Sequence, residues 1–210
     1  MSQDIIQGEN IKDSAQKGRK KPPKRITAQY LHNSGLAYLQ RFPASKPHFR
    51  RVMMRKIMRS CNYHREQCPE NCAKLLEEAI QTFERLGLLD DASYLKGMVT
   101  SLRGRGLSTQ AILAKLTQKG LTQEEIRAAL EIYDEDYVRN GLSPELRAAA
   151  LLARRKKLGP FSTLAREDRR KDKELAAMAR AGFSYDIASR ALEMDREAAE
   201  AVLDGRSPAA

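Results

Sequence analysis

The sequence predicts an all-α protein made of about three tandem three-helix repeats, stacked into an elongated, curved module. Three observations support this fold class. Apolar residues recur at helical spacing between residues suited to start and stop helices. No stretch shows the sustained alternation of β-branched residues that predicts a strand. A segment of the chain also returns in similar form later in the sequence, as repeat proteins require.

The chain is expected to begin with a disordered basic arm over residues 1–26 and to end in a flexible tail over 205–210. The arm contains Pro22-Pro23 and many charged residues without any periodicity, so it cannot bury enough apolar surface to fold alone. Its basic charge suits adhesion to a polyanion. A purely solubilising role explains the composition equally well.

Helix start and stop signals divide the remainder into repeats expected over 27–89, 90–140 and 141–204. Hydroxyl and carboxylate side chains can accept hydrogen bonds from the free N–H groups of a first helical turn. Such N-cap residues are Thr27, Ser45, Asp90, Ser108, Thr122, Ser143 and Ser184. Thr122 with Glu125 forms a capping box. Glycines that predict helix ends are Gly87, Gly104, Gly106, Gly120 and Gly182.

The internal repeat relates residues 112–122 to residues 174–184. In both, a short helix ends in Gly, followed by an apolar residue and a hydroxyl cap. The helix starting at Ser184 is expected to be the last of the chain. Each three-helix unit is too small for a strong core of its own, so stacking against neighbours must bury its remaining apolar faces. An elongated surface of this kind suits a long partner.

The charge of the chain points to an anionic partner. The sequence carries 38 Lys and Arg against 27 Asp and Glu, a formal net charge of +11. Nucleic acid, a membrane surface or an acidic protein face would all be attracted. Residues 147–173 are the densest basic region, and residues 121–136 have the opposite sign, with six acids and one Arg. Either feature could also be ordinary solvated surface.

Thirteen basic residues are candidates for contact with DNA or a protein partner. They are Arg50, Arg51 and Arg55 in the first repeat, Arg103, Arg105, Lys115 and Lys119 in the second, and Arg154, Arg155, Lys156, Lys157, Arg169 and Arg170 in the third. Cations of this kind neutralise phosphates and release counterions, which makes binding strongly salt-dependent.

No catalytic or cofactor-binding motif is evident, so we expect a non-enzymatic chain without a cofactor. There is no phosphate-binding G-x-x-x-x-G-K-[ST] loop and no G-x-S-x-G nucleophile motif. Asp90-Asp91 is interpreted as a helix cap, because adjacent helical side chains diverge. No apolar run is long enough to span a bilayer, and no secretory signal opens the sequence, so we expect a cytoplasmic protein without a membrane partner. We also expect a monomer.

Cys61, His64, Cys68 and Cys72 form the one possible metal site. Four thiol and imidazole ligands within twelve residues could surround a tetrahedral zinc ion, although their spacing matches no standard zinc finger. The alternative, a loop with incidental thiols in a reducing cytoplasm, is favoured. A zinc enzyme centred here is the weakest interpretation of the chain.

Several motifs, taken in order, resemble the RecX family. They are Leu86-Gly87-Leu88-Leu89-Asp90-Asp91 followed by Tyr94, then Arg103-Gly104-Arg105-Gly106, then Lys119-Gly120-Leu121, and finally Ala181-Gly182-Phe183-Ser184. The likeness covers roughly residues 30–195. It implies a non-enzymatic regulator that binds the bacterial recombinase RecA and its nucleoprotein filament. Such a regulator suppresses strand exchange, ATP hydrolysis and coprotease activity, and so affects DNA repair, recombination and the SOS response. The alternative is a general basic helical module that binds DNA or RNA without recombinase specificity.

Overall fold

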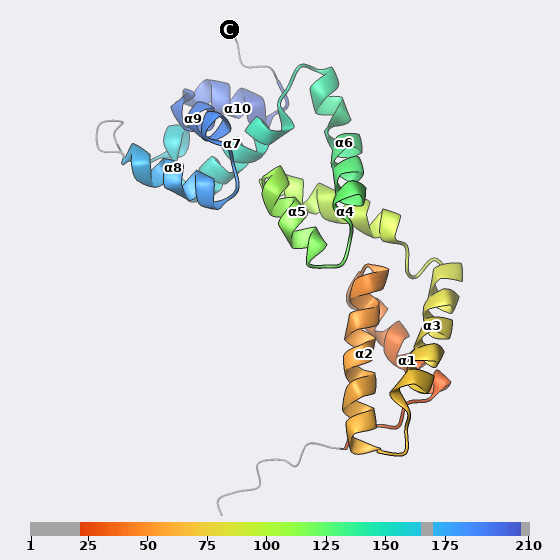
Figure 1. The fold of residues 1–210 in the computed structure, drawn as a ribbon. Helices are drawn as coiled ribbons and strands as arrows, with labels where there is room; N and C mark the ends of the chain where they lie inside the picture. Colours follow the sequence, from red (N-terminus) through yellow and green to blue (C-terminus); the bar gives the residue numbers. More distant parts are fainter. Residues whose placement is uncertain (1–21, 165–169, 207–210) are drawn as a thin grey trace, which may run out of the picture.

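The computed structural model describes residues 22–164 and 170–206, which form ten α-helices and one short 3-10 helix. No strand occurs among these residues, so the prediction of an all-α fold is confirmed. Figure 1 shows the helices gathered in three successive blocks that follow one another along a bent path. The repeat expected from the sequence is therefore visible as a physical succession of helical units.

The first block contains α1 (Ala28–Leu39), α2 (Lys46–Tyr63) and α3 (Pro69–Arg85). The expected caps are present, since Thr27 accepts a hydrogen bond from the N–H of Tyr30 and Ser45 from that of His48. The core of this block is built around Phe49 and Phe83, whose rings meet edge to face and are fully buried. Gly35 of α1 has no side chain to separate it from these rings, which allows the helices to approach closely.

The second block contains α4 (Asp91–Gly104), α5 (Thr109–Thr117) and α6 (Gln123–Arg139). Asp90 caps α4 by accepting hydrogen bonds from two backbone N–H groups, as expected for a cap. The capping box predicted at the start of α6 is complete. Its core includes four fully buried side chains, Val99, Ile112, Leu116 and Ile126.

The third block contains α7 (Pro144–Lys156), the 3-10 helix η1 (Gly159–Phe161), α8 (Lys171–Arg180), α9 (Tyr185–Glu193) and α10 (Arg196–Leu203). The expectation that the helix starting at Ser184 is the last is wrong. That helix ends at Glu193, and Asp195 caps a further helix whose Ala199, Val202 and Leu203 complete the core.

The three blocks share one packing plan. In each, the third helix contacts both of the others: α3 packs on α1 and α2, α6 on α4 and α5, and α9 on α7 and α8. Each block has its own cluster of buried apolar residues. Each fully buried aliphatic or aromatic side chain contributes about 1.5–3 kcal/mol. Each block therefore has a core of its own.

Part of the range expected to form the arm belongs to the folded first block. Residues 1–21 lie outside the described residues, as do residues 207–210 of the expected tail. Ile26, however, is a core residue with 4% exposure. Its backbone N–H and carbonyl both bond to the side chain of Gln67, while Ser60 donates to the carbonyl of Lys24. The arm prediction is wrong for this stretch because these partners, distant in sequence, satisfy its backbone groups.

Candidate functional site

A pair of hydrogen bonds joins the first block to the second at the N-terminus of α2, and we call it the first junction. The Ser45 hydroxyl donates to the carbonyl of Lys119 at 2.8 Å. The carboxylate of Asp91, in the first turn of α4, accepts a hydrogen bond from the backbone N–H of Lys46 at 2.6 Å. Gly120 has φ +90°, and a Cβ there would lie 2.6 Å from Pro47. The glycine therefore permits the close approach as well as the turn.

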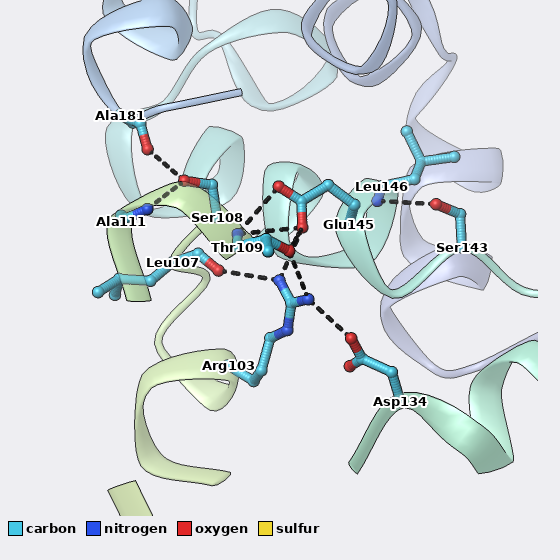
Figure 2. Close-up of polar contacts among 10 residues, drawn as sticks. All are labelled: Arg103, Leu107, Ser108, Thr109, Ala111, Asp134, Ser143, Glu145, Leu146 and Ala181. Atoms are coloured by element: carbon cyan, nitrogen blue, oxygen red, sulfur yellow. Dashed lines mark hydrogen bonds and ion pairs between the residues drawn. The ribbon is translucent and has the colours of Figure 1, made fainter. Parts of the chain in front are cut away.

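The same device joins the second block to the third at the N-terminus of α5, and Figure 2 shows this second junction. The Ser108 hydroxyl donates to the carbonyl of Ala181 at 2.7 Å. The carboxylate of Glu145, in the first turn of α7, accepts from the backbone N–H of Thr109 at 3.1 Å. Gly182, with φ +85°, leaves room for the Ser108 hydroxyl.

Each of these serines serves two elements at once. A hydroxyl group can donate one hydrogen bond and accept others. Ser108 accepts from the N–H of Ala111 at 3.1 Å to cap its own helix while it donates to the next block. Both serines are fully buried. An N-cap that looks purely local in the sequence therefore also sets the relative position of neighbouring blocks.

Arg103 lies inside the second junction and is only 4% exposed. Its guanidinium donates to Asp134 at 2.7 Å and Glu145 at 2.8 Å, and it also reaches Thr109 and the carbonyl of Leu107 (Figure 2). Burial raises the pKa of Asp134, and the neighbouring guanidinium opposes that rise. The expectation that Arg103 contacts a partner is therefore corrected: its charge is used within the fold.

Three cations expected at the binding surface gather around His48 beside the first junction. Arg51 donates to the carbonyl of Gln118 at 3.0 Å, across the junction. Burial lowers the pKa of His48, and the positive charges of Lys119, Arg51 and Arg55 lower it further. None of the three forms an ion pair with a carboxylate in the described parts of the chain. We call Arg51, Arg55 and Lys119 the junction cations.

The other candidate cations of the first two repeats differ in whether a carboxylate neutralises their charge. Arg50 forms two hydrogen bonds with Glu77, at 2.6 and 2.7 Å, so much of its charge is neutralised. Lys115 is exposed in the last turn of α5, four residues before Lys119, which lies in the turn after the helix. Lys115 therefore keeps an exposed charge, whereas the charge of Arg50 is largely used within the first block.

A second basic group lies at the C-terminal end of α7. Arg154, Arg155, Lys156 and Lys157 are all exposed there. Arg155 donates to the carbonyl of Arg105 at 3.0 Å, across the second junction. Cations at a helix C-terminus also compensate the helix dipole, so they have a structural reason to be there. Of the two remaining candidates, Arg170 is exposed at the start of α8, and Arg169 lies outside the described residues.

The four residues considered for zinc do not converge. Cys61 and Cys72 are buried with their sulfur atoms 3.9 Å apart, whereas Cys68 is exposed and donates to Glu70. His64 bonds to the carbonyl of Pro23 at 2.8 Å. Within the described ranges, no group of three or more Cys, His, Asp or Glu could hold a metal ion. The segment instead anchors the backbone that precedes α1, and we propose no zinc site here.

The inter-block role of Ser45, Ser108, Asp91 and Glu145 was missed by sequence reasoning. A signal was present, because Ser45 and Ser108 occupy matching places, as do the glycines at 120 and 182. Aligning the caps as well as the glycines would have identified both junctions. The partners of Arg103 lie 31 and 42 residues away and carry no local signal.

No described helix combines the length and the apolar character needed to cross a bilayer. No family model matches the chain, and no solved structure matches it.

Curated relatives give a consistent result. A protein of Myxococcus xanthus named "Regulatory protein RecX" is 37% identical over 180 residues, covering 82% of this chain and 89% of that protein. Agrobacterium fabrum has one of the same name that is 30% identical, covering 83% of this chain and 88% of its own length. A third, from Thermobifida fusca, is 30% identical over 64% of this chain and 69% of its own. Their shared name describes regulators, in agreement with the expectation of a non-enzymatic protein. With this identity over most of its length, the chain belongs to the RecX family.

Proposed function

We propose that this chain is a cytoplasmic, non-enzymatic regulator that binds the RecA recombinase and its nucleoprotein filament, and mainly inhibits it. The affected activities are ATP hydrolysis, strand exchange and coprotease activity, and through them DNA repair and the SOS response. The observation that carries the proposal is membership of the RecX family over most of the chain. No metal, cofactor or catalytic group has a part in this mechanism.

The geometry supports a mechanical mode of action. Three blocks linked by repeated junctions form a long body, and such a body suits a long partner better than a small ligand. Laid along the filament groove as a monomer, it would bridge adjacent recombinase subunits and block strand exchange. The junction cations, together with Arg105, Lys115, Arg170 and residues 154–157, are the groups we assign to contact with filament DNA.

The test is ATP hydrolysis by the cognate recombinase on single-stranded DNA, titrated with this protein. A regulator that disrupts or caps the filament should lower the rate at substoichiometric ratios, because one bound copy affects many subunits. An unchanged rate at a stoichiometric excess contradicts the proposal. If tight binding to naked DNA is found at the same time, the general nucleic-acid module replaces it.

The DNA-contact component is tested by changing Arg51, Arg55 and Lys119 together to Ala. Each lost phosphate contact should reduce the salt slope of log affinity for single-stranded DNA by about 0.7. A matched control changes three exposed, acid-paired cations to Ala, with the same loss of net charge: Arg190, Arg196 and Arg206. Equal slopes for the two triple variants would mean that the junction cations have no particular role.

A further inference from the structure

A groove of about 940 Å³ runs between α4 and α6, on the second block. Its walls include Leu95, Leu121, Ala129 and Tyr133, all at least partly buried. Ile132 also lines it and is 72% exposed, the highest exposure of any large aliphatic side chain in the described residues. An aliphatic side chain left in water beside an apolar groove indicates a surface that a partner covers.

Carboxylates surround this apolar surface. Asp91, Glu125 and Asp136 line the groove, with Lys96 as the one cation among its lining residues. Hydrogen bonds from the Thr122 backbone and hydroxyl hold the pKa of Glu125 below its usual range, which keeps it ionised. The side chain of Asp136 is 88% exposed, and its nearest cation, Arg139, is 3.8 Å away. The rim is therefore negative at neutral pH.

The sign of this surface is opposite to that of the whole molecule. Residues 123–139, which form α6, contain six acids and two Arg, a net charge of −4, in a chain of net charge +11. DNA would be repelled here and attracted to the junction cations. The two surfaces therefore suit different partners: the basic one suits phosphates, and the α4–α6 groove suits cationic groups with apolar neighbours.

We propose that the α4–α6 groove docks a short cationic amphipathic segment of the recombinase, with Ile132 as the apolar anchor and Asp136 and Glu125 facing its basic residues. This inference rests on the proposed function, because the recombinase is the protein partner. Amphipathic helices bind grooves in this manner, burying their apolar face while charged residues pair along the rim. In this arrangement the regulator binds DNA through the junction cations and the recombinase through the α4–α6 groove.

The test uses full-length Ile132→Ser and Asp136→Lys variants and measures their binding to recombinase filaments preformed on labelled single-stranded DNA. Loss of one buried aliphatic anchor should weaken filament binding roughly tenfold. Both side chains are exposed, so the thermal unfolding of the variants should match that of the wild type. Binding to naked single-stranded DNA should not weaken in either variant.

Matched controls are available in the third block. Asp186→Lys changes a similarly exposed acid that also has an Arg partner at 3.8 Å, and Tyr185→Ser removes an apolar side chain that is 75% exposed. Both should bind filaments as the wild type does. The chain's own basic arm is the alternative occupant of the groove. It is tested with a full-length variant in which Lys17, Arg19, Lys20 and Lys21 are changed to Ala.

The outcomes separate the groove from the proposed function. If wild type binds filaments and the groove variants bind equally well, the groove assignment is overturned while the function stands. Weaker binding of Ile132→Ser to naked DNA, by the same factor as to filaments, would make the groove a DNA surface and also overturn it. If the arm variant weakens filament binding as Ile132→Ser does, and a chain carrying both sets of changes binds no more weakly than either alone, the arm is the occupant and the groove assignment is overturned. Failure of the wild type to bind filaments at all overturns the proposed function and the groove assignment with it.

Discussion

The two junctions use the same backbone device but differ in what surrounds it. At the first, the carboxylate of Asp91 accepts from α2, and the neighbouring cations Lys46 and Arg50 pair with glutamates while their side chains remain 35% and 39% exposed. At the second, Glu145 is also bound by the buried guanidinium of Arg103. In addition, α7 packs on both α4 and α6, whereas no helix pair across the first junction packs as extensively among the described helices.

The same repeat interface can therefore differ in stiffness from one junction to the next. The ion pairs of Lys46 and Arg50 are open to water, which weakens them by competition and screening, whereas the Arg103 guanidinium is shielded from water. We expect the second and third blocks to move as one body and the first block to move relative to them. A regulator that follows a helical filament would gain from such a joint.

The largest expected effect comes from removing the group that distinguishes the second junction. Arg103→Met leaves the partly buried carboxylates of Asp134 and Glu145 without their cation, which should reduce the free energy of unfolding by about 3–5 kcal/mol. Arg50→Met, which breaks the half-exposed pair with Glu77, should cost only about 0.2–1 kcal/mol. Urea unfolding measures both losses, and hydrogen exchange locates them, in α4–α7 for Arg103→Met and in α2 and α3 for Arg50→Met. Similar losses in the two variants would remove the distinction between the junctions.

A smaller effect is expected at the two junction glycines. Gly120→Ala and Gly182→Ala place a Cβ 2.6 Å from Pro47 and 2.7 Å from the Ser108 hydroxyl. Gly141→Ala is the control, because it has φ +71° but nothing within 4 Å, so it carries only the left-handed strain of about 1–2 kcal/mol. The junction variants should lose about 1–3 kcal/mol more than the control. They should also increase the radius of gyration in small-angle scattering, which the control should not.

The smallest effect is a pH dependence confined to the first junction. The folded-state pKa of His48 lies below its ordinary value, because of burial and the junction cations. The unfolded chain therefore binds the proton first, so stability is fully present above the unfolded pKa and falls as pH drops through the folded pKa. Urea midpoints at pH 7.5 and 5.5 should differ less for His48→Gln than for wild type. An unchanged difference would assign the acid sensitivity to other groups.

Local signals in the sequence predicted local structure well. The capping box at Thr122 and the caps at Asp90 and Ser108 each act within a few residues, so the order of residue types identifies them. Asp195 carried the same kind of signal, with Ala199, Val202 and Leu203 at helical spacing after it. That helix was missed because three helices were expected per repeat, not because the signal was weak.

The site was less predictable, because charge alone does not report burial. Arg103, in the last turn of α4, and Arg105, just after that helix, stand two residues apart, yet the first is buried and the second is exposed. Only the carboxylates of Asp134 and Glu145, placed there by the fold, make burial of a guanidinium tolerable. The groove between α4 and α6 was equally hidden, although the acidic character of residues 121–136 indicated its sign.

The junctions join unlike surfaces, since the face that donates the serine differs from the face that receives it. Contacts of this head-to-tail kind can continue from molecule to molecule and build open-ended fibres unless the last surface is altered. Among the described residues of the third block, the second helix, α8, has Arg170 at its N-cap position and no side-chain cap, where its counterparts have Ser45 and Ser108. Without that hydroxyl, α8 does not present the donor through which α2 and α5 each hold the following block, so this end of the series lacks the contact on which a further block or a second copy of the chain would be added.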